Sequence, residues 1–88
     1  MPHTYEDVLQ HIIDYLRNKL KGAKGVPEID ENADFTRDIN ADSLLIFAIV
    51  EELEDTYKII IPLELLYKQK IQTVAELAKE VMRLLDNS

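Results

Sequence analysis

The stretch from Asp38 to Tyr57, DINADSLLIFAIVEELEDTY, decides how the rest of this chain is organised. It begins with residues typical of a polar turn, and these are followed by a long segment in which apolar residues recur at helical spacing. Ser43 lies at the junction between the two. The pattern predicts a helix that begins at Asp42 or Ser43 and ends near Thr56. The residues that would form its inward face are Ile46, Ile49, Val50, Leu53 and Tyr57.

The place of Ser43 at a helix start is compatible with two roles. A serine there commonly caps the helix, because its side-chain oxygen accepts a hydrogen bond from an unpaired backbone N–H group. The same helix start concentrates free N–H groups and partial positive charge, which favour an anion such as a phosphate ester. A hydroxyl placed there is exposed, and a phosphodiester attached to it would be well held.

Further helices are predicted on both sides of this one. Apolar residues at helical spacing predict a helix over Tyr5–Leu20, with Gly22 as its stop. A short helix is expected over Leu63–Tyr67. Thr73 and Glu76 have the spacing of a capping box that opens the last helix. The β-branched run before the short helix has no second strand to pair with, so we assign no strand to it.

A long connection, Gly22 to Ala41, joins the first two helices and has no sustained hydrophobic period. We expect a few apolar side chains to anchor it in the core. Asn40, near its end, is one of the few residue types that tolerate a left-handed backbone in a turn. The expected anchors are Val26, Ile29 and Phe35.

Together these elements predict an all-α fold. The three long helices and one short helix describe a small four-helix bundle with a long loop after the first helix. The length of 88 residues predicts a single domain over residues 1–88.

The charge and composition of the chain narrow the classes of function. The net charge is −7, and residues 28–55 hold ten carboxylates against one cation, Arg37. This balance excludes a nucleic-acid surface, which needs a basic face, and favours basic protein partners. The chain has no cysteine, and therefore no disulfide and no thiolate site. No apolar run is long enough to cross a membrane and no signal pattern opens the chain, so we expect a cytoplasmic monomer.

The sequence contains no recognisable catalytic motif. It has neither a glycine-rich phosphate-binding loop nor a recognisable pair of nucleophile and general base. His3 and His11 are far apart in the sequence, and we expect surface or packing roles for them rather than a metal site. We therefore predict no catalytic residue, no metal ligand and no enzyme.

Several short motifs around Ser43 occur together. They are Asp38-Ile39, Ala41-Asp42-Ser43-Leu44, the acidic run Glu51-Glu52-Leu53-Glu54-Asp55, and Ile61-Pro62. At these residues the chain resembles the acyl carrier proteins. The resemblance implies a bundle of the acyl-carrier type and a 4′-phosphopantetheine arm attached to Ser43, delivered from coenzyme A by a magnesium-dependent phosphopantetheinyl transferase.

The resemblance also implies a function and a set of partners. The protein would carry acyl intermediates as thioesters and present them to activating and condensing enzymes of fatty-acid, polyketide or related biosynthesis. It would catalyse nothing itself. Asp42 would position the serine or the metal of the transferase, and Leu44 would contact partner enzymes at the base of the arm. The acids that would meet cations on partners are Glu51, Glu52, Glu54 and Asp55.

The chain departs from the fatty-acid members of the family just after the serine, where Leu45 and Ala48 stand in place of carboxylates. With Leu44 and Phe47, these residues are expected to form an apolar patch, which indicates a dedicated partner recognised by apolar contact. The segment Leu63–Lys70 is less acidic and slightly longer than usual, at the place where the mouth of an acyl pocket would lie.

Other functions stay open at this point. An aminoacyl or peptidyl carrier, including a D-alanyl carrier, would use the same attachment chemistry with a different cargo. An unmodified acidic adaptor with the carrier fold, or a small regulatory subunit of an enzyme, would not use the hydroxyl of Ser43 at all.

The acidic segment predicts that salt stabilises the protein. The carboxylates of residues 28–55 should repel one another, and added salt or divalent cations should weaken that repulsion. We expect the melting temperature, followed by circular dichroism, to rise when the ionic strength is raised from low to physiological values. A melting temperature that stays flat over this range would show that the carboxylates do not lie close together.

Overall fold

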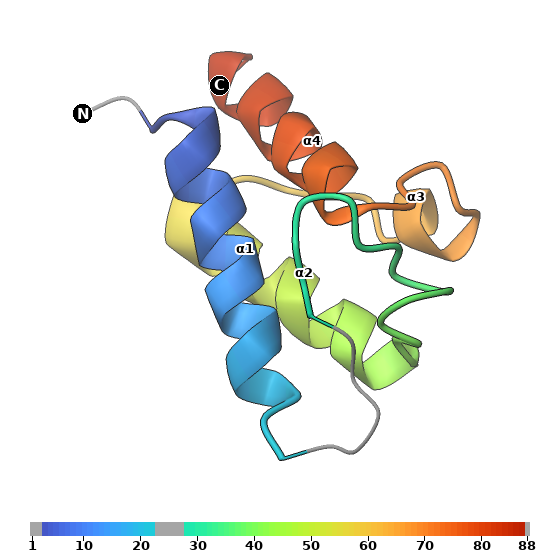
Figure 1. Ribbon diagram of the computed structural model, residues 1–88. Helices are drawn as coiled ribbons and strands as arrows, with labels where there is room; N and C mark the ends of the chain where they lie inside the picture. The colour runs from blue at the N-terminus through green and yellow to red at the C-terminus, as the bar shows by residue number, and fades with distance from the viewer. Residues whose placement is uncertain (1–2, 23–27, 88) are drawn as a thin grey trace.

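The computed structural model describes residues 3–22 and 28–87 and contains four helices in this part of the chain. They are α1, Tyr5–Lys19; α2, Ser43–Tyr57; α3, Glu64–Tyr67; and α4, Val74–Asp86. α1 and α4 lie side by side, α2 crosses α1, and α3 lies near the start of α4 (Figure 1). The predicted bundle of three long helices and one short helix is confirmed.

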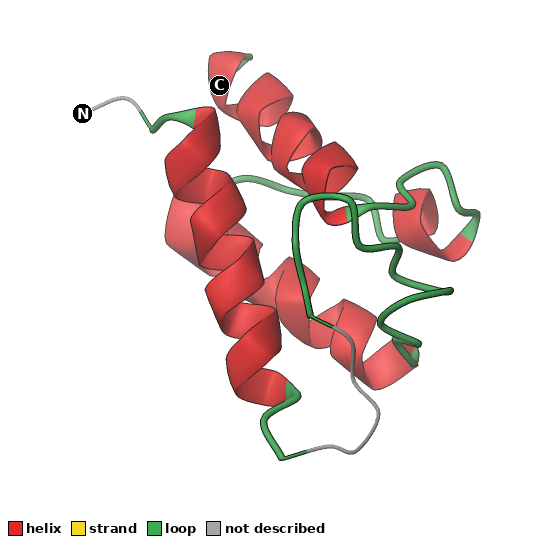
Figure 2. Cartoon of the chain, in the orientation of Figure 1, coloured by secondary structure: helices red, strands yellow, loops and turns green. Residues whose placement is uncertain are grey.

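Loops make up the rest of the described chain (Figure 2). Within residues 3–22 and 28–87 no strand forms, and one isolated antiparallel bridge pairs Asp34 with Thr73. The β-branched run before α3 is irregular, as predicted. The bridge was not predicted, because its two residues lie far apart in the sequence.

The helix ends follow from local capping residues. The Thr4 hydroxyl accepts a hydrogen bond of 3.1 Å from the backbone N–H of Asp7 at the start of α1. Gly22, just beyond the end of α1, has a φ of 87°, which glycine adopts without strain. Thr73 and Glu76 form the predicted capping box at the start of α4.

The core forms where α1, α2 and α4 meet. α1 packs mainly against α4 and also against α2. Fully burying one large aliphatic side chain contributes about 1.5–3 kcal/mol, so this shared face fixes how each helix is rotated. Ile46, predicted on the inward face of α2, is only partly buried and packs at the edge of the core. The largest fully buried side chains are Val8, Ile12, Leu16, Ile49, Leu53, Val74, Leu77 and Val81.

The connection before α2 is anchored by apolar side chains. Ile29 and Phe35 are buried as predicted, whereas Val26 lies outside the described residues. Ala33 and Ile39 are buried as well. Their burial was not predicted, because a lone apolar residue in a polar loop carries no periodic signal.

Backbone hydrogen bonds tie this connection to the start of α4. The N–H of Phe35 donates to the carbonyl of Gln72 at 2.8 Å, and the N–H of Val74 donates to the carbonyl of Ala33 at 3.0 Å. The connection leads directly into α2, so its attachment to α4 determines where α2 begins.

Two acids of this connection serve the fold itself. The carboxylate of Asp34 accepts hydrogen bonds from the N–H groups of Thr36 (2.8 Å) and Arg37 (2.9 Å). The carboxylate of Asp38 accepts one from the N–H of Asp34 at 2.8 Å. These contacts close local turns, which explains how a segment so rich in carboxylates adopts a defined path.

Candidate functional site

Ser43 is the first residue of α2 and is exposed. Its hydroxyl makes no hydrogen bond to any residue in the ranges 3–22 and 28–87. Asp42, not Ser43, caps the helix: its Oδ1 accepts a hydrogen bond of 2.9 Å from the N–H of Leu45. The serine hydroxyl is therefore left available for chemistry.

The turn before the helix supports this arrangement. Asn40 has a φ of 55°, the left-handed conformation expected for it from the sequence. The next residue, Ala41, donates its N–H to the carbonyl of Phe35 at 2.8 Å, which closes the turn. The left-handed residue turns the chain so that Asp42 reaches the cap position and Ser43 follows it into the helix.

The start of α2 fits a phosphodiester. The N–H groups of Leu45 and Ile46 are bonded to the side chain and the carbonyl of Asp42, respectively. The N–H groups of Ser43 and Leu44 have no partner within the described part of the chain. Free N–H donors at the positive end of a helix dipole suit phosphate oxygens.

The apolar residues after Ser43 point in two directions, some toward solvent and some toward α1. Leu44 is 79% exposed and Phe47 is 51% exposed. Leu45 and Ala48 are half-buried and line the side of α2 that faces α1. The apolar patch predicted from the sequence is therefore made mainly of Leu44 and Phe47, and the two residues that replace carboxylates contribute less to it.

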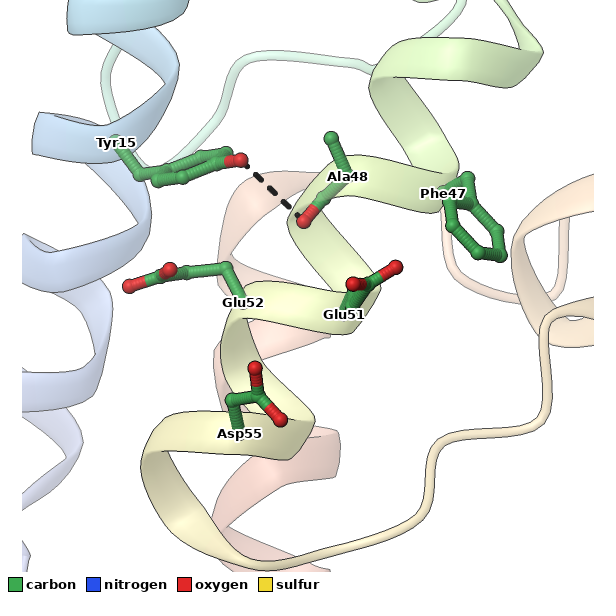
Figure 3. A pocket seen from close by; sticks show the side chains of 6 residues that line it. All are labelled: Tyr15, Phe47, Ala48, Glu51, Glu52 and Asp55. Atoms are coloured by element: carbon green, nitrogen blue, oxygen red, sulfur yellow. Dashed lines mark hydrogen bonds between the residues drawn. The ribbon is translucent and has the colours of Figure 1, made fainter.

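The carboxylates of α2 also divide into two kinds. Glu54 accepts a hydrogen bond of 2.7 Å from the N–H of Ile61, so it ties α2 to the connection that follows. Glu52 extends toward α1 (Figure 3), where its Oε2 lies 2.8 Å from Nε2 of His11. Glu51 and Asp55 are exposed and make no hydrogen bond or ion pair to any described residue. Two of the four predicted docking acids are thus engaged within the chain.

His11 belongs to a polar cluster between α1 and α2. Its Nδ1 lies 2.9 Å from the hydroxyl of Tyr57, and its Nε2 faces Glu52. A carboxylate only accepts, so Nε2 carries the proton and the Tyr57 hydroxyl donates to Nδ1 when the ring is neutral. Burial, with the negative charges of Asp7 and Glu52, raises the pKa of Tyr57. His11 therefore bridges α1 and α2 through hydrogen bonds to Tyr57 and Glu52.

Two shallow grooves lie between α1 and α2. The first is lined by Phe47, by the acids of α2 and by Tyr15, whose hydroxyl donates to the carbonyl of Ala48 at 3.4 Å (Figure 3). The second lies nearer Ser43, between the end of α1 and the start of α2. Ala48 lines both grooves.

Neither a metal-binding cluster nor a membrane-spanning helix occurs in the described ranges 3–22 and 28–87. No three His, Cys, Asp or Glu side chains there gather in a way that could hold a metal ion. None of the helices in that part of the chain combines the length and the apolar character that a membrane crossing requires.

Comparison with known proteins relates this geometry to a family. The family model described as "Phosphopantetheine attachment site" matches residues 14–81, a span that includes Ser43. An acyl carrier protein of Brachyspira hyodysenteriae (strain ATCC 49526 / WA1) is 36% identical over 74 residues, which cover 84% of this chain and 91% of that protein. A second protein named acyl carrier protein, from Brachyspira hyodysenteriae, matches with the same identity and coverage.

The capping role of Asp42 leads to a stability prediction. Asp42→Ala removes the acceptor for the Leu45 N–H and should lower the free energy of unfolding by about 1 kcal/mol, measured by urea denaturation. Asp42→Asn is the matched control, because asparagine also caps well and should keep the free energy within about 0.5 kcal/mol of the original. Equal losses in both variants would contradict the role of the hydrogen bond.

Proposed function

Because the chain belongs to the family of phosphopantetheine-bearing carrier proteins, we propose that Ser43 is the residue that carries the 4′-phosphopantetheine arm. Members of this family are carriers rather than enzymes. They depend on a phosphopantetheinyl transferase, which attaches the arm, and on client enzymes, which act on the cargo. The arm supplies a thiol that holds this cargo as a thioester.

The observation that carries the proposal is the free hydroxyl of Ser43. Asp42 accepts the capping hydrogen bond, so modification of Ser43 breaks no hydrogen bond between its hydroxyl and a described residue. The unpaired N–H groups of Ser43 and Leu44 lie where the phosphate would be attached. A serine that capped the helix itself would have one oxygen lone pair engaged by a backbone N–H and its side chain held in the capping geometry.

The attachment step can be written for the residues of this chain. The oxygen of Ser43 forms a bond to the phosphorus of 4′-phosphopantetheine as the pyrophosphate bond of coenzyme A breaks. Adenosine 3′,5′-bisphosphate is the leaving group, and the hydroxyl proton is released to solvent. Asp42 uses Oδ1 for the cap, and its Oδ2 makes no hydrogen bond to a described residue. We assign Oδ2 to the magnesium ion that the transferase brings.

We assign acyl groups as the cargo, in fatty-acid, polyketide or related biosynthesis. The support is that the similar proteins from Brachyspira hyodysenteriae are named acyl carrier proteins. Aminoacyl or peptidyl cargo, including D-alanine, is the second candidate. Leu45 and Ala48 stand where the resemblance leads us to expect carboxylates in a fatty-acid carrier, which argues against a generic fatty-acid-synthase carrier and for a dedicated partner.

The partner enzymes are proposed to bind one stripe of α2. Leu44, Phe47, Glu51 and Asp55 are exposed and follow one another at intervals of three or four residues, which places them along one side of a helix. We call these four residues the docking face. Its apolar half lies beside Ser43 and its acidic half lies toward the end of α2. A partner that fits it presents an apolar pocket next to basic side chains.

The docking face predicts which substitutions slow attachment of the arm. Phe47→Ala should lower kcat/KM of a phosphopantetheinyl transferase for this protein about tenfold, because roughly 1.4 kcal/mol of apolar contact is lost. Ile60→Ala is the matched control: Ile60 is 81% exposed but follows α2, at the end far from Ser43. It should leave kcat/KM unchanged. Equal effects of the two substitutions would contradict a specific docking face.

The attachment of the arm is tested by intact-protein mass spectrometry. The protein is incubated with coenzyme A, magnesium and a broad-specificity transferase, beside the variant Ser43→Ala. The original protein should gain one phosphopantetheine unit and the variant none, because the variant lacks the accepting oxygen.

Circular dichroism of both proteins excludes unfolding as the cause of a missing mass gain. A folded protein that gains nothing would favour the unmodified adaptor. A gain on Ser43→Ala would place the arm on another residue.

A further inference from the structure

The groove beside the start of α2 combines apolar side chains with one basic, one acidic and one amide side chain, next to the proposed attachment site. It has a volume of about 330 Å³ and runs between the end of α1 and the start of α2. Asp42 and Leu44, the two sequence neighbours of Ser43, both line it. A chain attached to Ser43 therefore starts at the rim of this groove. The other lining residues are Lys19, Asn40 and the apolar Leu20, Leu45 and Ala48.

We propose that the phosphopantetheine arm on Ser43 folds back into this groove and rests there between visits to partner enzymes. The phosphate would face Lys19, and the methyl and methylene groups of the arm would cover Leu20, Leu45 and Ala48. This inference rests on the proposed function, because it requires the arm to be attached to Ser43.

Charge favours this direction for the arm. The ammonium group of Lys19 lies 5.5 Å from the ring centroid of Tyr15 and forms no ion pair with a described carboxylate. Among the described residues that line the groove, it is the basic one. The far half of α2 instead exposes Glu51 and Asp55, which repel a phosphate. The arm therefore gains an attraction on the α1 side that the acidic half of α2 does not offer.

The length of the arm fits the groove. The arm is comparable in length with about five extended residues and therefore spans about 17 Å. α2 rises about 1.5 Å per residue, so Ala48 lies about 8 Å along the helix from Ser43. The arm can cover the groove as far as Ala48 and place its thiol over the neighbouring groove, where Tyr15 and Phe47 lie.

The groove and the docking face share Leu44. This residue lines the groove and is also 79% exposed. A partner that covers Leu44 would compete with the resting arm and would favour its release toward the partner. Because the arm is tethered, even weak contacts in the groove hold a large share of the arm molecules there.

The test uses the absence of cysteine, which makes the thiol of the arm the only one in the loaded protein. A nitroxide label is attached to this thiol on ¹⁵N-labelled protein, and the paramagnetic relaxation of each backbone amide is measured by NMR. We expect the strongest relaxation at the amides of Tyr15 and Ala48, which line the neighbouring groove where the thiol is placed. Relaxation that is strongest at α3, or equal over α2 and α3, would overturn the proposal.

A charge reversal tests the role of Lys19. Lys19→Glu should reduce the relaxation at Tyr15 and Ala48 about threefold, the effect expected for one exposed ion pair. Lys21→Glu is the matched control, because it makes the same charge change at an exposed residue outside the groove lining. Equal effects of both variants, or no effect of either, would overturn the assignment of the phosphate to Lys19.

Failure of this inference differs from failure of the proposed function. If the folded protein gains no mass, it has no thiol to label, and if Ser43→Ala gains the same mass, the arm is on another residue; either result overturns both. If the arm is attached but relaxation is not concentrated at the groove, the carrier function stands and only the resting site is wrong.

Discussion

The burial of Ile49 and Leu53 against the core is the constraint on which the rest of the site depends. Both side chains are fully buried where α2 meets the other long helices. A helix is a rigid rod with 3.6 residues per turn, so burying one face fixes the direction of every other residue. This rotation turns Leu44 outward and Leu45 toward α1. The docking face and the groove both follow from it.

The position of the site along the molecule depends on a second set of contacts. The connection before α2 is bonded through its backbone to the start of α4 and is anchored by Phe35. It ends in the left-handed turn at Asn40 and the cap at Asp42. Because Asp42 satisfies the helix start, Ser43 is exposed without any bond of its own. The hydroxyl of Ser43 is thus free because Asp42 forms the capping hydrogen bond in its place.

The acidic character of the chain does not serve a single purpose. Asp34 closes a turn, Glu54 holds the connection after α2, and Glu52 bonds His11 across two helices. Glu51 and Asp55 alone among the acids of α2 proposed to contact partners make no such contact to a described residue. A count of carboxylates therefore overstates the charge that is free to attract a partner, since a hydrogen-bonded carboxylate is partly neutralised and held in place.

The sequence by itself determined the four helices, the capping box of α4 and the place of Ser43 at the start of α2. These features depend on residues within a few positions of one another, where periodicity and capping rules apply. The tertiary structure decided which residues far apart in the sequence come into contact. Glu52 bonds a residue 41 positions away, and Lys19 shares a groove with Ala48. Such pairings form only when distant segments pack together, and hydrophobic periodicity carries no information about which segments those will be.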